Sequence, residues 1–120
     1  MIEALHHVQL AMPRGAEDEA RAFYADILGF DEVEKPELLR GRGGVWFSRG
    51  SVELHLGVEE PFSPARKAHP ALRVASLDQM VRHLDDRQVS YRRDVDLPAL
   101  RRVYVDDPFG NRIELLELLE

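Results

Sequence analysis

Hydrophobic and polar positions along this chain follow two periodicities in turn. Residues 5–11, LHHVQLA, alternate with period two, which is the pattern of a half-buried β-strand. Residues 17–30, EDEARAFYADILGF, place apolar side chains three and four positions apart, which predicts an amphipathic helix that ends at Gly29. Short alternating runs predict three further strands, at residues 30–34, 44–48 and 51–58, the last two joined by a tight turn at Arg49-Gly50.

The same order of elements returns after residues 59–67, a segment with prolines and charges that is predicted to be a linker. Residues 69–75 alternate as a strand. The next four, Ser76-Leu77-Asp78-Gln79, have the Ser and Gln of a capping box, which predicts the start of a second helix. Three more strands are predicted, at residues 90–92, 102–106 and 111–116.

The chain is therefore predicted to have an α+β fold made of a duplicated βαβββ module. Module 1 spans about residues 4–58 and module 2 about residues 68–117, within a single domain of residues 1–120. Each module is longer than the repeating unit of a solenoid, so we predict two copies of one module and not an array.

Strand parity sorts the side chains into an aliphatic face and a polar face, because residues two apart share a face. In residues 51–58, Leu54 and Leu56 lie opposite Glu53 and His55. In residues 5–11, His7 is on the polar side, whereas His6 shares the aliphatic side and is predicted to be structural. The predicted polar faces collect His7, Glu53, His55, His69, Tyr104 and Glu114.

The spacing of these side chains repeats between the modules. Forty-six positions separate His7 from Glu53, and forty-five separate His69 from Glu114. Two imidazoles and two carboxylates on one sheet face would suit a divalent first-row metal, namely Zn, Ni, Mn, Co or Fe(II). If Glu53 stays off the metal, His7, His69 and Glu114 form a two-His-one-carboxylate arrangement with open positions.

Four other residues are predicted to take part in the site. His55 competes with Glu53 for the place of fourth ligand, and otherwise it would contact the substrate. Trp46 and Tyr104 are predicted to form the pocket wall, and Arg102 would favour an anionic substrate if it faces the pocket.

Composition narrows the class of protein. Sixteen basic and twenty-two acidic residues give a net charge of −6, which disfavours nucleic acid as a partner. The chain has no cysteine, no charged segment followed by an apolar run at its start, and no apolar stretch near the ~20 residues of a membrane helix. We therefore expect a cytoplasmic protein with neither membrane nor nucleic acid as partner.

The chain resembles the vicinal oxygen chelate superfamily over nearly its whole length. The resemblance rests on LHHVQLAM, ARAFYADILGF, VELHLG, AHPALRVASLDQ and VYVDDPFGNRIELLE, in this order and spacing. This superfamily includes glyoxalase I, fosfomycin-resistance thiol transferases, extradiol dioxygenases and bleomycin-resistance proteins. The family's ligand positions fall on His7, Glu53, His69 and Glu114 of this sequence.

The resemblance implies a curled mixed sheet, or half-open barrel, with the helices on its outer face. It also implies a homodimer, in which some members build each site from both chains. The substrate would chelate the metal through two neighbouring oxygens, with the metal as Lewis acid. In the isomerase version a carboxylate moves a proton between adjacent carbons, and Glu53 or Glu114 would be that catalytic residue.

Two functions follow from the resemblance. The first is a metal-dependent lyase, isomerase or dioxygenase that acts on a small oxygenated molecule. The second is a metal-free small-molecule binding protein of the bleomycin-resistance type. The presence of His7, His69 and Glu114 favours the enzyme, whereas the net negative charge and Trp46 would suit a binding protein for a cationic ligand. Gln9 stands where fosfomycin-resistance transferases have threonine, which disfavours that activity.

Overall fold

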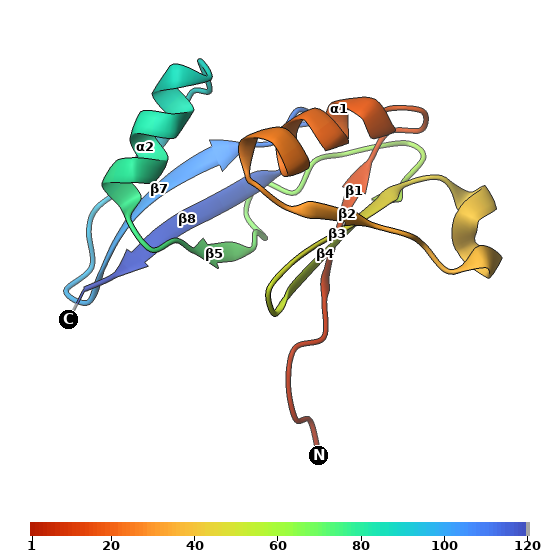
Figure 1. Ribbon diagram of the computed structural model, residues 1–120, viewed down its shortest axis with the longest axis horizontal. Helices are drawn as coiled ribbons and strands as arrows, with labels where there is room; N and C mark the ends of the chain where they lie inside the picture. Colours follow the sequence, from red (N-terminus) through yellow and green to blue (C-terminus); the bar gives the residue numbers. More distant parts are fainter. Residues whose placement is uncertain (120) are drawn as a thin grey trace. The chain divides into compact units, whose positions relative to one another are not determined.

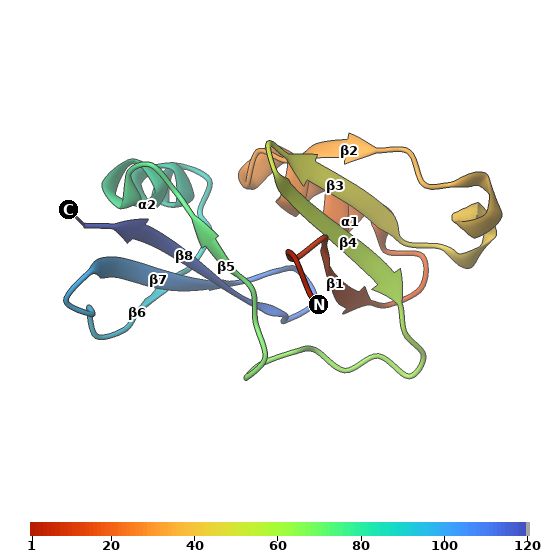
Figure 2. The same cartoon turned by 90° about the horizontal axis from the view of Figure 1, so that it is seen from below.

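The chain folds into two compact units, with the boundary along the chain between Pro64 and Ala65, in the computed structural model, which describes residues 1–119. Each unit contains one open, four-stranded mixed sheet with a helical segment against it (Figures 1 and 2). The predicted α+β class and the duplicated βαβββ order are therefore confirmed.

The first unit has the strand order β1-β4-β3-β2, with β1 parallel to β4 and the other neighbours antiparallel. Its elements are β1 (Val8–Met12), α1 (Glu17–Arg21), η1 (Ala22–Ile27), β2 (Asp31–Val33), η2 (Glu37–Arg42), β3 (Val45–Arg49) and β4 (Val52–Val58).

Helix and sheet of the first unit enclose an apolar core, as the parity of the strands predicts. Leu10, Leu54 and Leu56 are buried on the aliphatic face of β1 and β4. The ring of Tyr24 stacks on that of Phe47 of β3 at a centroid distance of 5.4 Å. The second half of the predicted helix, η1, is a π-helix, whose wider turn lets the adjacent Phe23 and Tyr24 both enter the core.

Three local predictions for the first unit differ from the structure. The first strand begins at Val8, so His7 lies just before it. The β3–β4 turn lies at Gly50-Ser51, one residue later than predicted, because Arg49 pairs with Val52. The short 3₁₀-helix η2 was not predicted, since its sequence ELLRGR has no helical run long enough to show periodicity.

The second unit repeats this arrangement with the strand order β5-β8-β7-β6, and β5 is parallel to β8. Its elements are β5 (Ala71–Arg73), α2 (Leu77–Asp86), β6 (Arg92–Arg93), β7 (Leu100–Asp106) and β8 (Arg112–Leu118). The predicted helix start is confirmed, because the Ser76 hydroxyl accepts a hydrogen bond from the Gln79 backbone N–H at 3.2 Å.

The loop DPFGN between β7 and β8 is held by one buried carboxylate. Asp107 accepts hydrogen bonds from the backbone N–H of Phe109 at 2.9 Å, and from the backbone N–H and Nδ2 of Asn111 at 2.8 and 2.9 Å. Gly110 has φ +93°, a left-handed conformation that favours glycine. This loop sets where β8 begins, and therefore where Glu114 lies along that strand.

Replacing Asp107 by alanine is expected to lower the free energy of unfolding by about 2 to 4 kcal/mol, because three buried donors lose their acceptor. The neighbouring Asp106→Ala removes an exposed pair with Arg92 and is expected to cost less than about 1 kcal/mol. Urea denaturation of both variants measures the difference. Equal losses for the two would show that the loop is not held in this way.

Candidate metal centre

The first unit brings the ring of His7 against that of His55. The two rings stack at a centroid distance of 4.4 Å and an interplanar angle of 20°. Since β1 and β4 are parallel neighbours and Gln9 pairs with His55, side chains on the same face of the two strands lie close together. His7 and His55 form what we call the first half-site.

Trp46 of β3 extends this stack. It pairs with His55 across the strands, and their rings stack at 3.7 Å with an interplanar angle of 3°. His55 is only 4% exposed. Trp46 therefore covers one side of the His55 ring in the first half-site. Its role as the wall of a substrate pocket stays a prediction.

Burial lowers the pKa of His55, and the charge of nearby His7 lowers it further, while Glu53 acts in the opposite direction. The neutral form of His55 is therefore favoured. A neutral imidazole is the form that binds a metal ion.

Glu53 lies on the same face of β4 as His55 and is half-buried. It makes no hydrogen bond or ion pair with any other described residue. The spacing along the chain suggested that Glu53 is equivalent to Glu114, but the strand register places another residue at that position. Glu114 pairs with Tyr104, just as His55 pairs with Trp46, so the duplicated fold makes His55 the counterpart of Glu114.

The second unit joins His69 to Glu114, and we call this pair the second half-site. His69 Nε2 lies 3.0 Å from Glu114 Oε1, and Glu114 is 7% exposed. The other ring nitrogen, Nδ1, lies 2.8 Å from the backbone carbonyl of Lys67. A histidine that binds a metal is commonly oriented in this way by a carbonyl on its far nitrogen.

Arg102 and Tyr104 lie beside this pair, and their roles toward a substrate stay predictions. Arg102 donates a hydrogen bond to the Tyr104 hydroxyl at 3.2 Å, and its Nη1 lies 3.7 Å from Glu114 Oε2. The ring of His69 meets that of Tyr104 edge-on at 5.4 Å. Arg102 also contacts Asp94 at 3.4 Å, so its charge is already shared between two carboxylates.

The donors of the two half-sites suit a divalent metal. Within residues 1–119 no three His, Asp or Glu side chains gather into one group that could hold a metal ion. They form instead two pairs, one in each unit. His69 Nε2 and Glu114 Oε1 are the two donor atoms that the second half-site would offer to a divalent cation.

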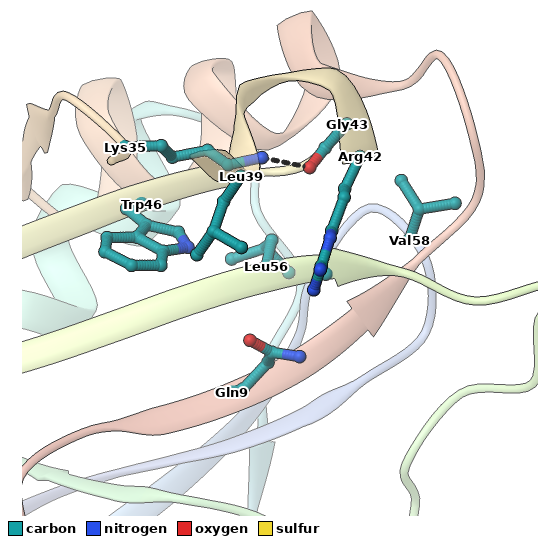
Figure 3. A pocket seen from close by; sticks show the side chains of 9 residues that line it. Gln9, Lys35, Leu39, Arg42, Gly43, Trp46, Leu56 and Val58 are labelled. Carbon is teal, nitrogen blue, oxygen red and sulfur yellow. Dashed lines mark hydrogen bonds between the residues drawn. The ribbon is translucent and has the colours of Figure 1, made fainter. Parts of the chain in front are cut away.

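The structure adds residues that the sequence did not single out. A cavity of about 260 Å³ in the first unit is bordered by Trp46 and Gln9 and by Lys35 and Arg42 (Figure 3). Lys35 and Arg42 lie at the two ends of η2. A sequence signal that could have found them is the glycine-rich run GRGG beside Trp46.

The sequence profile of the Glyoxalase/Bleomycin resistance protein/Dioxygenase superfamily matches residues 4–115. The chain belongs to this superfamily. Its structure is similar to that of a Bacillus anthracis protein described as a member of the glyoxalase family, with 46% sequence identity and a TM-score of 0.96. That match covers 99% of this chain and 98% of the other.

More distant superfamily structures include both an enzyme and a binding protein. Lactoylglutathione lyase from Agrobacterium tumefaciens is 22% identical with a TM-score of 0.75, over 97% of this chain and 94% of that one. TnmS3, an antibiotic binding protein from Streptomyces sp. CB03234, is 22% identical with a TM-score of 0.76. That match covers 99% of this chain and 100% of the TnmS3 chain. At this identity they share the fold alone. No curated protein matches this chain.

Membership of the superfamily confirms the resemblance that the sequence motifs indicate. It does not choose between enzyme and binding protein, because the same fold serves both. None of the helices within residues 1–119 is long and apolar enough to cross a membrane.

Proposed function

We propose that this protein is a metal-dependent enzyme of the glyoxalase or dioxygenase type. Its substrate is a small molecule that presents two neighbouring oxygen atoms. The observation that carries this proposal is the partly buried pair of His69 Nε2 and Glu114 Oε1, 3.0 Å apart, with the far nitrogen of His69 beside a backbone carbonyl. A protein that only binds and sequesters a ligand does not require this pair.

The two half-sites together would supply four ligands to one Zn, Ni, Mn, Co or Fe(II) ion. They would come from one chain or from two copies of it in a homodimer. The ligands are His7 and His55 from the first unit, and His69 and Glu114 from the second. We place the enzyme in the cytoplasm, since a chain with no cysteine needs no oxidising compartment to fold.

His55 is favoured over Glu53 as the fourth ligand for two reasons. Its ring stacks on that of His7, the first-strand ligand. It also occupies the strand position that corresponds to Glu114 in the second unit. Glu53, which has no hydrogen-bond partner among residues 1–119, is left available to carry a proton.

The metal, when bound, supplies Lewis-acid polarisation of the two substrate oxygens. Glu53 would then take a proton from the carbon beside the polarised oxygen and return it to the next carbon, as a general base and acid. The hydrogen bond between Arg102 and Tyr104 fixes a donor beside Glu114 that can orient a substrate oxygen. Trp46 excludes water from one side of the first half-site.

The assignment of the fourth ligand is tested by two neighbouring substitutions. Replacing His55 by glutamine is expected to weaken Zn²⁺ binding by about ten- to a hundred-fold, because a donor to the metal is lost. Replacing Glu53 by glutamine keeps the shape of the side chain and is expected to leave Zn²⁺ affinity within about two-fold of the parent. Competition titration with a chromophoric chelator measures both affinities. The reverse order would make Glu53 the ligand and His55 a substrate contact.

The second candidate is a metal-free binding protein of the bleomycin-resistance type. It is favoured by the cavity beside Trp46 and by the similarity in fold to an antibiotic binding protein. Tight binding of an aromatic ligand by protein with no metal affinity would support this candidate over the enzyme.

A further inference from the structure

The cavity of the first unit lies beside the first half-site. Its volume is about 260 Å³, which suits a small molecule, and it is open to solvent on one side. Trp46 both lines this cavity and stacks on His55 at 3.7 Å. A molecule in the cavity would therefore contact the same indole ring that covers a proposed metal ligand.

Two cationic side chains border this cavity, and neither has a carboxylate partner among the described residues. The Lys35 ammonium donates one hydrogen bond to the backbone carbonyl of Gly43, which leaves its other N–H groups available. The Arg42 guanidinium, which is exposed, makes no ion pair within residues 1–119.

Three other arginines of the first unit are paired with carboxylates, and Arg49, which has no such partner within residues 1–119, does not line the cavity. Arg14 bonds Glu60, Arg21 bonds Glu32, and Arg40 bonds Glu34. Arg40 is on the same short helix η2 as Arg42. In a chain of net charge −6, two cations that line the same cavity and have no carboxylate partner in the described part of the chain point to a negatively charged ligand.

Gln9 adds a neutral hydrogen-bonding group from the opposite wall. Figure 3 shows its amide and the Arg42 guanidinium extending toward each other across the cavity. The amide is held against the backbone of Gly57, where a Cβ atom would lie only 2.6 Å from Gln9 Nε2. The absence of a side chain at Gly57 thus makes room for the Gln9 amide in the cavity wall.

Leu39 and the Trp46 ring form the apolar part of the cavity's border (Figure 3). We infer that the cavity binds a small molecule with an oxyanion, carboxylate or phosphate, held by Lys35, Arg42 and Gln9, and an apolar body on Trp46 and Leu39. Arginine and lysine together suit either oxyanion. We take this molecule to be the substrate, and that step rests on the function proposed above. The anion site itself does not depend on the proposed function.

Trp46 is the only tryptophan of the chain, so its fluorescence reports on the cavity directly. Protein freed of metal by a chelator is titrated with benzoate, with phenyl phosphate and with the neutral benzamide. We expect saturable binding of at least one anion. Benzamide is expected to bind at least about ten-fold more weakly than that anion. A preference for benzoate would identify a carboxylate site, and a preference for phenyl phosphate a phosphate site.

The variant Arg42→Gln is expected to weaken anion binding by about ten-fold, because one charged hydrogen-bond donor is lost. Arg40→Gln, on the same helix but paired to Glu34, is the matched control and should bind like the parent. Lys35→Gln tests the second cation. Equal binding of benzamide and the anions, no response to any of the three, or unchanged binding in both Arg42→Gln and Lys35→Gln would overturn the inference.

The titration separates this inference from the proposed function. Because it uses metal-free protein, loss of the metal site would leave the anion response intact. Conversely, a protein that binds metal but shows no anion response would refute only the anion site.

Discussion

Replacing Glu114 by alanine is expected to weaken divalent-metal binding by about a hundred-fold or more, the largest loss of metal affinity expected for any single substitution. Glu114 is the one carboxylate that is buried against an imidazole, with Oε1 at 3.0 Å from His69 Nε2, among the described residues. Its removal takes away one proposed ligand and one of the two carboxylates that lie beside Arg102. Competition titration with Zn²⁺ measures the loss.

A matched control separates loss of the ligand from loss of the fold. Glu59 is an exposed glutamate just after β4, and Glu59→Ala should bind Zn²⁺ like the parent. Far-UV circular dichroism of Glu114→Ala verifies that the fold is retained. A folded Glu114→Ala protein with parental affinity would remove Glu114 from the ligand set.

Replacing Glu53 by glutamine is expected to lower turnover by about a hundred- to ten-thousand-fold while metal stays bound. Glutamine keeps the size of the side chain but cannot accept and return a proton. The assay uses the members of a panel that the parent turns over, chosen from hemithioacetals of keto-aldehydes, epimerisable acyl thioesters and catechols. Metal content is measured on the same preparations.

The comparison with His55→Gln makes this prediction specific. His55→Gln should lose metal and turnover together, whereas Glu53→Gln should lose turnover alone. If added metal restores the turnover that Glu53→Gln has lost, Glu53 is a metal ligand. Full activity in Glu53→Gln would exclude it as the proton carrier.

The sequence predicted the fold well because two periodicities alternate cleanly along it. The parity of residues 51–58 placed Leu54 and Leu56 in the core and His55 on the other face, and both placements are confirmed. Parity depends only on the alternation of residues along one strand. It therefore predicts the polar faces on which His7 and His55 lie without any knowledge of how the strands pair.

Strand register could not be predicted in the same way, because it depends on the turn between strands. The β3–β4 turn falls one residue later than expected, at Gly50-Ser51. Spacing along the chain matched Glu53 with Glu114, whereas strand pairing matches His55 with Glu114. Glu53 and His55 are two residues apart and share a face of β4, so the register decides which of them we propose as the fourth ligand.

The anion-binding residues were missed for a different reason. Lys35 and Arg42 flank the short helix η2, where no periodic pattern marks the direction of a side chain. What marks Lys35 and Arg42 is that neither has a carboxylate partner among the described residues. The sequence alone does not show which charged side chains form ion pairs.

Metal content of tag-free protein purified without chelator tests the central claim most directly. Plasma mass spectrometry is applied to the parent and to two adjacent variants, His7→Gln and His6→Gln, of which only the first changes a proposed ligand. We expect near-stoichiometric metal in the parent and in His6→Gln, and its loss in His7→Gln. No metal in the parent, even after reconstitution with Zn, Ni, Mn and Fe(II), would contradict the proposed enzyme and make His7, His69 and Glu114 polar groups of a binding cup.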